Sequence, residues 1–408
     1  MSAGRVLEQT LGDILSVIKP SWEDQIARNR IIEELRTIVQ SMDIFRGATV
    51  EPFGSFVSGL FTRWGDLDIS IELPNGSYIS SAARDRKKLM LGFLQSRLIG
   101  RFQKLQFISS ARVPIVKFES RSISCDVSVD NLSGQMKSKL LLWIKGIDAR
   151  FGDMVLLVKE WAKAQEINNS KSGSFNSYSL TLLVIFHFQT CVPAILPPLK
   201  DIYAGDIVND LQGIRADVVR KITETCTANI ARWKSNRYRA VNQSSLSELS
   251  ISFFSKFSDI SQKARDLGIC PYTGKWEALR SNTRWWLQTP AIFIEDPFER
   301  PENAARTVKT SLMMKISEAF ETTYQKVSSN YQTEDSLLPE LARPRVLKAL
   351  GRTPSRAGSS SGNRNRTNGS VVASSSQVLQ QFQNMSLQNR GMAQNSQPRR
   401  NTDLFFDL

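Results

Sequence analysis

The segment FGSFVSGLFTRWGDLDIS (53–70) combines residue types that bind phosphate with residue types that bind metal ions. Gly54 and Gly59 have the spacing of a phosphate loop, but no Lys-Ser or Lys-Thr pair follows Gly59. Further along, Asp66 and Asp68 stand two positions apart. From this stretch alone, the segment could be a damaged nucleotide loop, a surface turn or half of a metal site.

The two acidic residues favour the metal site, because they begin a predicted strand, DLDISIEL (66–73), with period-2 alternation. Asp66 and Asp68 then project from one face, where two carboxylates repel each other unless a cation lies between them. A third acid, Asp126, lies in another predicted strand. Three such carboxylates could hold two magnesium ions, one activating an attacking hydroxyl and one stabilising the leaving phosphates.

The pair Gly54-Ser55 suits phosphate binding without a lysine, since glycine permits close backbone approach and serine offers a hydroxyl. A Gly-Ser pair alone is uninformative, and an Asp-X-Asp sequence is more often a solvated strand edge. The ordered set is much more specific: Gly-Ser, ten residues, Asp-X-Asp, and then Asp126. It favours an intact phosphate-transfer site that differs from a P-loop.

Composition limits the other possibilities. The 408 residues are 41% hydrophobic with eight tryptophans, which is enough for two globular domains. No apolar run is long enough to span a membrane, and the first residues lack the pattern of a secretory signal. The net charge of +14 suits a polyanionic partner such as nucleic acid, although a basic soluble protein would also have it.

The cysteines and the single histidine exclude several site types. Four cysteines stand far apart without a CxxC pair, which argues against zinc and favours a reducing compartment. One histidine, His187, removes most Ser-His and Cys-His schemes, and its apolar neighbours indicate a structural role.

Hydrophobic periodicity outlines the elements. A helix is predicted over 22–42 and a hairpin over 111–131, followed by helices near 137–151, 153–167, 178–192, 208–235 and 244–267. The segment 289–308 reads as a short buried strand, a turn and a helix start. Residues 351–408 are rich in Ser, Asn, Gln and Arg, and this composition predicts a disordered tail.

These motifs resemble the DNA polymerase β-type nucleotidyltransferase superfamily, and within it the noncanonical poly(A) polymerases and terminal uridylyltransferases. The likeness continues through LLVKEWAKAQEIN (156–168), FNSYSLTLLVIFHFQ (175–189), SLSELSISFFSKFS (245–258) and IEDPFERPENAARTV (294–308). It covers about residues 10–325. Within this family, the chain resembles the plant enzymes that tail unmethylated small RNAs.

The resemblance implies an α+β fold with a polymerase β-like palm, a mixed sheet with helices. It implies an N-terminal helix (1–20) that packs on the second domain and a catalytic nucleotidyltransferase domain (21–160). A mostly helical poly(A)-polymerase-associated domain (161–340) would recognise the base, and the tail (351–408) would follow.

Residue roles follow from the same resemblance. Asp66, Asp68 and Asp126 would be catalytic and bind two Mg²⁺ or Mn²⁺ ions. The nucleotide would contact Gly54, Ser55, Lys159, Lys163, Ser177, Tyr178, Asp296 and Glu299. In this set Tyr178 stacks on the base, and the two acids can accept a hydrogen bond from the N3–H of uracil, for which adenine has no counterpart.

Two positions depart from the family pattern. Glu302 stands where a uridylyltransferase can carry a histidine that disfavours ATP, and Lys137 stands where relatives place an asparagine near the ribose. Both departures bear on the choice between UTP and ATP.

The expected activity is template-independent addition of UMP from UTP to RNA 3′ ends, on small RNAs or RNA fragments, promoting their turnover. The alternatives are a poly(A) polymerase using ATP, a catalytically silent RNA-binding adaptor, and transfer of a nucleotide to protein or a small molecule. RNA would lie in a basic cleft between domains. Argonaute-type proteins are expected partners of a monomer located in the cytoplasm and nucleus, not secreted and not on a membrane.

Overall fold

The computed structural model describes residues 3–74, 84–211, 215–283, 285 and 290–352, and most of the predicted tail (353–408) lies outside this set. The described part up to residue 352 belongs to one compact unit. In it, no helix is both long and apolar enough to cross a membrane.

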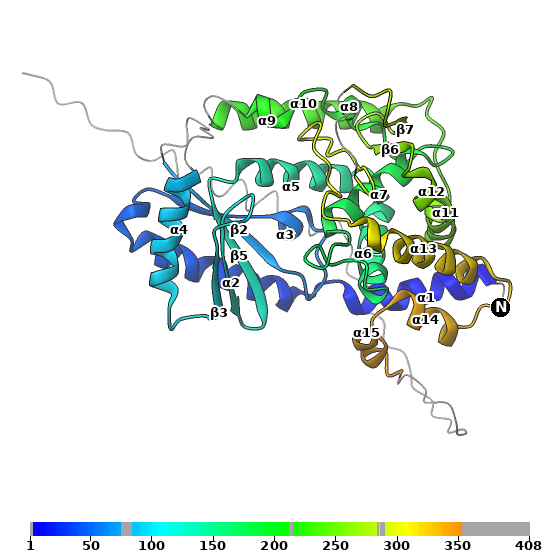
Figure 1. Cartoon of the computed structure of the whole chain (residues 1–408), viewed down its shortest axis with the longest axis horizontal. Coiled ribbons are helices and arrows are strands. Elements are labelled where there is room, and N and C mark those ends of the chain that lie inside the picture. Colours follow the sequence, from blue (N-terminus) through cyan, green and yellow to red (C-terminus); the bar gives the residue numbers. More distant parts are fainter. Residues whose placement is uncertain (1–2, 75–83, 212–214, 284, 286–289, 353–408) are drawn as a thin grey trace, which may run out of the picture. The chain divides into compact units, whose positions relative to one another are not determined.

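A five-stranded mixed sheet forms the first part of the fold, in the order β1-β2-β5-β4-β3 (Figure 1). The strands are β1 (Thr49–Phe53), β2 (Leu67–Glu72), β3 (Gln103–Ile108), β4 (Ile115–Ser120) and β5 (Ile123–Val129). Only the central pair β2·β5 is parallel, and the other pairs are antiparallel. The predicted hairpin is therefore β4–β5, and the α+β class with a mixed sheet is confirmed.

Helices cover this sheet and close its core. Helix α2 (Trp22–Gln40) packs on β1, and α4 (Arg84–Leu98) packs on β3, β4 and β5. Ser21 caps α2 through a capping box with Asp24, as expected of a serine before a helical pattern. Apolar residues of α2, α4 and the strands form one continuous buried cluster.

The second part is mostly helical, and the bounds of its elements are as follows: α5 (Leu132–Lys145), α6 (Ala149–Ala164), α7 (Ser177–Gln189), α8 (Leu199–Ile202), α9 (Ile207–Asp210), α10 (Arg215–Ser235), α11 (Leu246–Phe257), α12 (Ile260–Lys263), α13 (Met313–Ser328), α14 (Glu334–Leu341) and α15 (Pro344–Ala349). A small hairpin joins β6 (Leu267–Cys270) and β7 (Lys275–Ala278). The N-terminal helix α1 (Ala3–Ile18) buries its apolar face against α6, α11 and α14.

The strand predicted within 289–308 is not a named strand. The segment makes two isolated bridges, Ile269↔Ile294 and Glu295↔Asn303. Prolines at 290, 297 and 301 interrupt it, and proline cannot donate to a strand ladder. The helix expected next begins only at Met313, after a short 3₁₀ turn (Thr310–Leu312).

His187 lies inside α7, whose side chains are buried on nearly every face. The imidazole is 1% exposed, its Nε2 is 3.3 Å from Ser252 Oγ, and it meets the rings of Phe188 and Phe253. Burial lowers the pKa of His187 to about 3.

This depressed pKa predicts a pH dependence of stability. A histidine that is kept neutral in the folded state stabilises fully above its unfolded pKa near 6.5, and that contribution is lost as the pH falls toward the folded pKa. Relative to a His187→Asn variant, wild type should lose about 2 kcal/mol of unfolding free energy between pH 7 and pH 5. Urea titrations of both proteins at the two pH values measure this difference. Identical losses would mean that the buried ring protonates freely.

Candidate active site

Gly54 brings the chain into contact with the first acidic strand. It follows β1, begins the short helix α3 (Gly54–Ser58), and has φ +70°. A Cβ placed there would lie 2.0 Å from Asp68 Oδ2, so only glycine fits. The Gly54 amide donates to Ser138 Oγ of α5 at 2.6 Å, which fixes the turn, and Ser55 follows within α3.

The three predicted catalytic acids gather at one edge of the β2·β5 pair. Asp68 and Asp126 are direct partners in the parallel register, and Asp66 precedes β2. Neighbouring strands lie about 5 Å apart, so the two paired carboxylates are adjacent. Burial, then Asp126 and Asp66, raise the pKa of Asp68 to about 7. Burial also raises the pKa of Asp66.

Lys117, which sequence reasoning missed, contacts this acidic group directly. It lies on β4 opposite Asp126, and its Nζ is 2.7 Å from Asp126 Oδ1. Burial lowers the pKa of the lysine, but the hydrogen bond to Asp126 and the charges of the three acids together outweigh burial and raise it. A hairpin turning at residues 121–122 pairs positions 117 and 126, so the hairpin register was the available signal.

The donor set fits a divalent cation in its chemistry. Three carboxylates supply hard oxygen ligands, and the raised pKa values of Asp66 and Asp68, caused first by burial and then by the neighbouring acids, show that their negative charge is costly here, a cost that a bound cation would reduce. The side chains do not stand in a ready metal-binding arrangement: among the described residues, no three His, Cys, Asp or Glu side chains form one. Asp126 is turned onto Lys117 instead.

The two predicted phosphate-binding lysines lie one turn apart on α6. Lys159 is buried and donates through Nζ to Leu60 O at 2.9 Å, just after α3. Burial and the neighbouring Lys163 lower its pKa to about 7. Burial and Arg343 lower the pKa of Lys163, while Asp66 opposes that effect. Asp68 acts on the pKa of Lys159 and Asp66 acts on that of Lys163, so the two lysines lie near these two acids.

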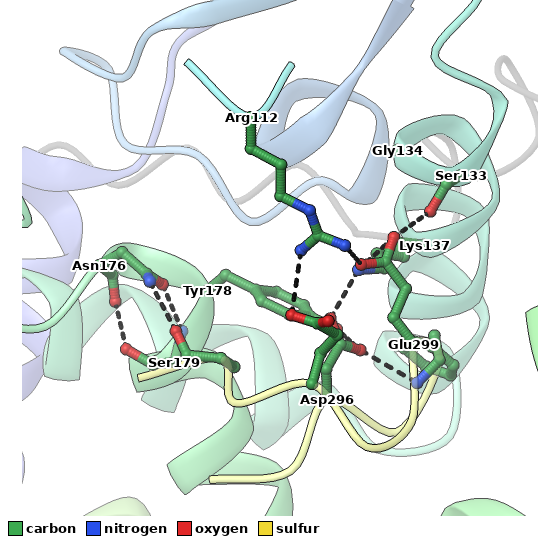
Figure 2. A network of polar contacts seen from close by, with 12 residues as sticks. Arg112, Ser133, Gly134, Lys137, Asn176, Tyr178, Ser179, Asp296 and Glu299 are labelled. Atoms are coloured by element: carbon green, nitrogen blue, oxygen red, sulfur yellow. Dashed lines mark hydrogen bonds and ion pairs between the residues drawn. The ribbon is translucent and has the colours of Figure 1, made fainter. Parts of the chain in front are cut away.

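A polar network around Tyr178 joins two other predicted nucleotide contacts, Asp296 and Glu299 (Figure 2). Tyr178 Oη donates to Asp296 Oδ1 at 2.9 Å, and Lys137 Nζ lies 2.6 Å from Asp296 Oδ2. The same ammonium is 3.2 Å from Glu299 Oε1 and 5.3 Å from the centre of the Tyr178 ring. Asp296 is 4% exposed, so these contacts hold its carboxylate as a fixed acceptor.

Two more donors reach Glu299, one from the start of α5 and one from the segment between β3 and β4. Ser133 Oγ donates to Glu299 Oε1 at 2.6 Å, and Arg112 lies 3.0 Å from Glu299 Oε2 (Figure 2). Arg112 also lies 3.5 Å from Glu302. Burial raises the pKa of Glu299. The contacts with Lys137, Ser133 and Arg112 outweigh burial, so the pKa lies below its usual value. No local sequence pattern predicted that the segment around Glu299 would contact these three residues, Arg112, Ser133 and Lys137.

Ser177 stands apart from this network. Its side chain is exposed at the start of α7 and donates to Asn168 Oδ1 at 3.2 Å. Tyr178, the next residue, is half-buried, and burial and Asp296 raise its pKa well above the usual value. The neutral phenol therefore stays a donor to Asp296.

Sequence comparison identifies relatives over most of the chain. Residues 7–145 match the family described as "Poly(A) RNA polymerase, mitochondrial-like, central palm domain". Protein HESO1 of Arabidopsis thaliana is 52% identical over 357 residues, which is 86% of this chain and 70% of that protein. Poly(A) RNA polymerase cid11 of Schizosaccharomyces pombe is 25% identical over 332 residues, which is 78% of this chain and 62% of that protein.

Solved structures share the fold. A cytoplasmic RNA terminal U-transferase superposes with a TM-score of 0.64 at 24% identity, covering 83% of this chain and 99% of that one. The structure of mtPAP in complex with ATPγS superposes with a TM-score of 0.65 at 19% identity, covering 83% of this chain and 73% of that one. At 52% identity to a relative across most of both chains, and with this fold, the protein belongs to the noncanonical poly(A) polymerase and terminal uridylyltransferase family of nucleotidyltransferases.

Proposed function

We propose that this nucleotidyltransferase adds UMP from UTP to RNA 3′ ends without a template. The observation that carries the proposal is the buried Asp296 carboxylate, fixed by Tyr178 and Lys137. A fixed carboxylate can accept a hydrogen bond only from a donor, which uracil offers at N3. The fold shared with a structure named as an RNA terminal U-transferase supports the same activity.

The residues at the β2·β5 edge would perform the transfer. Mg²⁺ or Mn²⁺ ions held by Asp66, Asp68 and Asp126 would, when bound, neutralise charge on the reacting oxygens. Gly54 keeps the backbone close to Asp68, where the triphosphate can approach. Lys117 orients Asp126, which lies beside the position proposed for the RNA hydroxyl and can accept its proton. Catalysis of this kind consists mainly of positioning and charge neutralisation.

We extend the proposal to the biological substrates. Unmethylated small RNAs, including miRNAs, and RNA fragments would be tailed and turned over, with Argonaute-type proteins as partners in RNA silencing. The enzyme would act as a monomer in the cytoplasm and nucleus. The family resemblance of the motifs quoted above supports this extension.

Incubating one RNA oligomer with each of the four NTPs tests the activity. We expect kcat/KM for UTP to exceed that for ATP by about 10-fold or more, because uracil presents its N3–H donor to the fixed carboxylate whereas adenine presents the acceptor N1. A preference for ATP would establish a poly(A) polymerase instead. No incorporation of any nucleotide would leave the RNA-binding adaptor and nucleotide transfer to another acceptor.

Lys137 provides a sharper test of the base site. Lys137→Met would leave Asp296 and Glu299 without their ammonium partner, so kcat/KM for UTP should fall about 10- to 100-fold. Lys88→Met is the matched control, because Lys88 pairs with the exposed Asp85 at 3.3 Å on α4. Single-turnover kinetics with UTP and ATP measure both variants. A variant at Lys137 that keeps wild-type selectivity and rate would contradict the assignment of this network to the base.

A further inference from the structure

Trp64 forms a cationic cluster with three arginines, two residues before Asp66. The Cζ atom of Arg345 lies 4.0 Å from the centre of the indole, that of Arg343 5.8 Å and that of Arg63 5.9 Å. None of these residues had a predicted role. We call Trp64, Arg63, Arg343 and Arg345 the Trp64 cluster.

The loop that carries Trp64 is held rigidly by a buried side chain. Arg28 is fully buried and donates to Gly65 O at 2.6 Å and to Arg63 O at 3.2 Å. The Arg63 amide donates to Ile18 O at the end of α1. Trp64 itself packs against the large helical core. The indole is thus a fixed platform beside a predicted catalytic acid.

Two of the cations near this platform are already neutralised. Arg343 binds the buried Glu160 through Nε, Nη2 and its backbone amide, with Nε–Oε1 at 2.8 Å. Arg63 lies 3.7 Å from Asp24. Each of these two arginines is therefore already paired with a carboxylate.

Arg345 and Lys163 have no such partner. Within the described ranges, neither side chain lies within ion-pair distance of a carboxylate. Lys163 follows Glu160 by one turn on α6, so it shares the face to which Arg343 is bound. Besides burial, the charges of Arg343 and Arg345 lower the pKa of Lys163, and the charge of Asp66 raises it. Lys163 is therefore within electrostatic range of both Arg345 and Asp66, and no carboxylate of the described residues holds either of the two cations.

We infer that Arg345, together with Lys163, forms a subsite for the terminal phosphates of the incoming nucleotide and for the departing pyrophosphate. Stacking on Trp64 engages the face of the guanidinium and leaves its in-plane N–H groups for phosphate oxygens. A polyphosphate carries several charges and suits two cations better than a single phosphodiester does. The inference rests on the proposed function, since it assigns a second contact to the same triphosphate.

Inhibition by inorganic pyrophosphate tests this subsite in the full chain. Arg345→Gln should raise both the inhibition constant for pyrophosphate and the KM for UTP by about 3- to 10-fold, as expected for one charged contact at a partly exposed position. Arg345→Lys keeps the charge and should retain most of the affinity. The KM for RNA and the melting temperature should stay at wild-type values. Arg46→Gln, which removes an exposed arginine paired with Asp43, is the control.

Three outcomes would overturn the inference. Unchanged pyrophosphate inhibition in Arg345→Gln would leave Arg345 as a cover for Trp64. A raised KM for RNA alone would assign the cation to the nucleic-acid backbone. A loss of stability shared equally by the Gln and Lys variants, with normal pyrophosphate binding, would show a purely structural role.

Direct binding separates this inference from the proposed function. Calorimetric titration of wild type and Arg345→Gln with pyrophosphate and Mg²⁺ needs no turnover. A wild-type protein that binds pyrophosphate through Arg345 but transfers no nucleotide would retain the subsite and refute the uridylyltransferase. If wild type transfers UMP and both proteins bind pyrophosphate equally, the uridylyltransferase is retained and the subsite at Arg345 is refuted.

Discussion

Replacing Asp68 with asparagine is expected to abolish nucleotide addition and, in the same variant, to stabilise the fold. Asp68 lies against Gly54, pairs in register with Asp126 and is one of the three acids proposed to hold the metal ions. Removing its charge should lower kcat/KM by about 10³-fold or more, as the loss of a principal catalytic group does. Extension of a labelled RNA oligomer with UTP measures the rate.

The gain in stability follows from the charge on the folded protein. A carboxyl whose folded pKa is raised, here to about 7 from 3.8, destabilises the fold increasingly as the pH rises above the unfolded pKa, and the loss is complete once the pH exceeds the folded pKa. The same group costs nothing below its unfolded pKa. At pH 8 with a chelator present, Asp68→Asn should therefore unfold with a free energy about 1–3 kcal/mol higher than wild type. At pH 4 the two proteins should be nearly equal.

Urea titrations at the two pH values check this second effect, with Asp85→Asn as a control on a fully solvated acid. Full catalytic activity in Asp68→Asn would remove the residue from the site. A variant that is inactive and also less stable at pH 8 would mean that the charged Asp68 carboxylate does not destabilise the folded protein.

The sequence predicted those parts of the site that depend on local patterns. Alternation along 66–73 and 121–131 placed Asp68 and Asp126 on strands, and the structure makes these strands direct neighbours. Helical spacing likewise predicted that Lys159 and Lys163 share a face of α6. These relations need only the period of the element that carries each residue.

Contacts between distant segments could not be predicted in this way. Lys137 meets Asp296, which is 159 positions away, and Arg343 meets Glu160, which is 183 positions away. No periodicity relates such residues, because the packing of whole helices brings them together. The departures at Lys137 and Glu302 were visible in the sequence, but their ion pairs with Asp296 and Arg112 required the structure.

Gly54→Ala should be the most damaging substitution at a position that has no side chain to lose. The new Cβ would lie 2.0 Å from Asp68 Oδ2 and 2.9 Å from Asp68 Cγ, so the carboxylate must move. A displacement of about 1 Å in a reacting group costs about 100-fold in rate, and we expect kcat to fall by that amount. The backbone at φ +70° adds a stability cost of about 1 kcal/mol, because alanine disfavours the left-handed region.

Gly59→Ala separates the two effects. Gly59 has φ +64°, close to that of Gly54, but its Cβ would meet only the flexible end of Lys145, with Nζ at 2.7 Å. Both variants should therefore lose similar unfolding free energy, whereas only Gly54→Ala should lose catalysis. Steady-state kinetics with UTP and urea titrations of the pair measure this. If the two variants lost activity to the same extent, backbone strain alone would account for the requirement, and the contact between Gly54 and Asp68 would have no catalytic consequence.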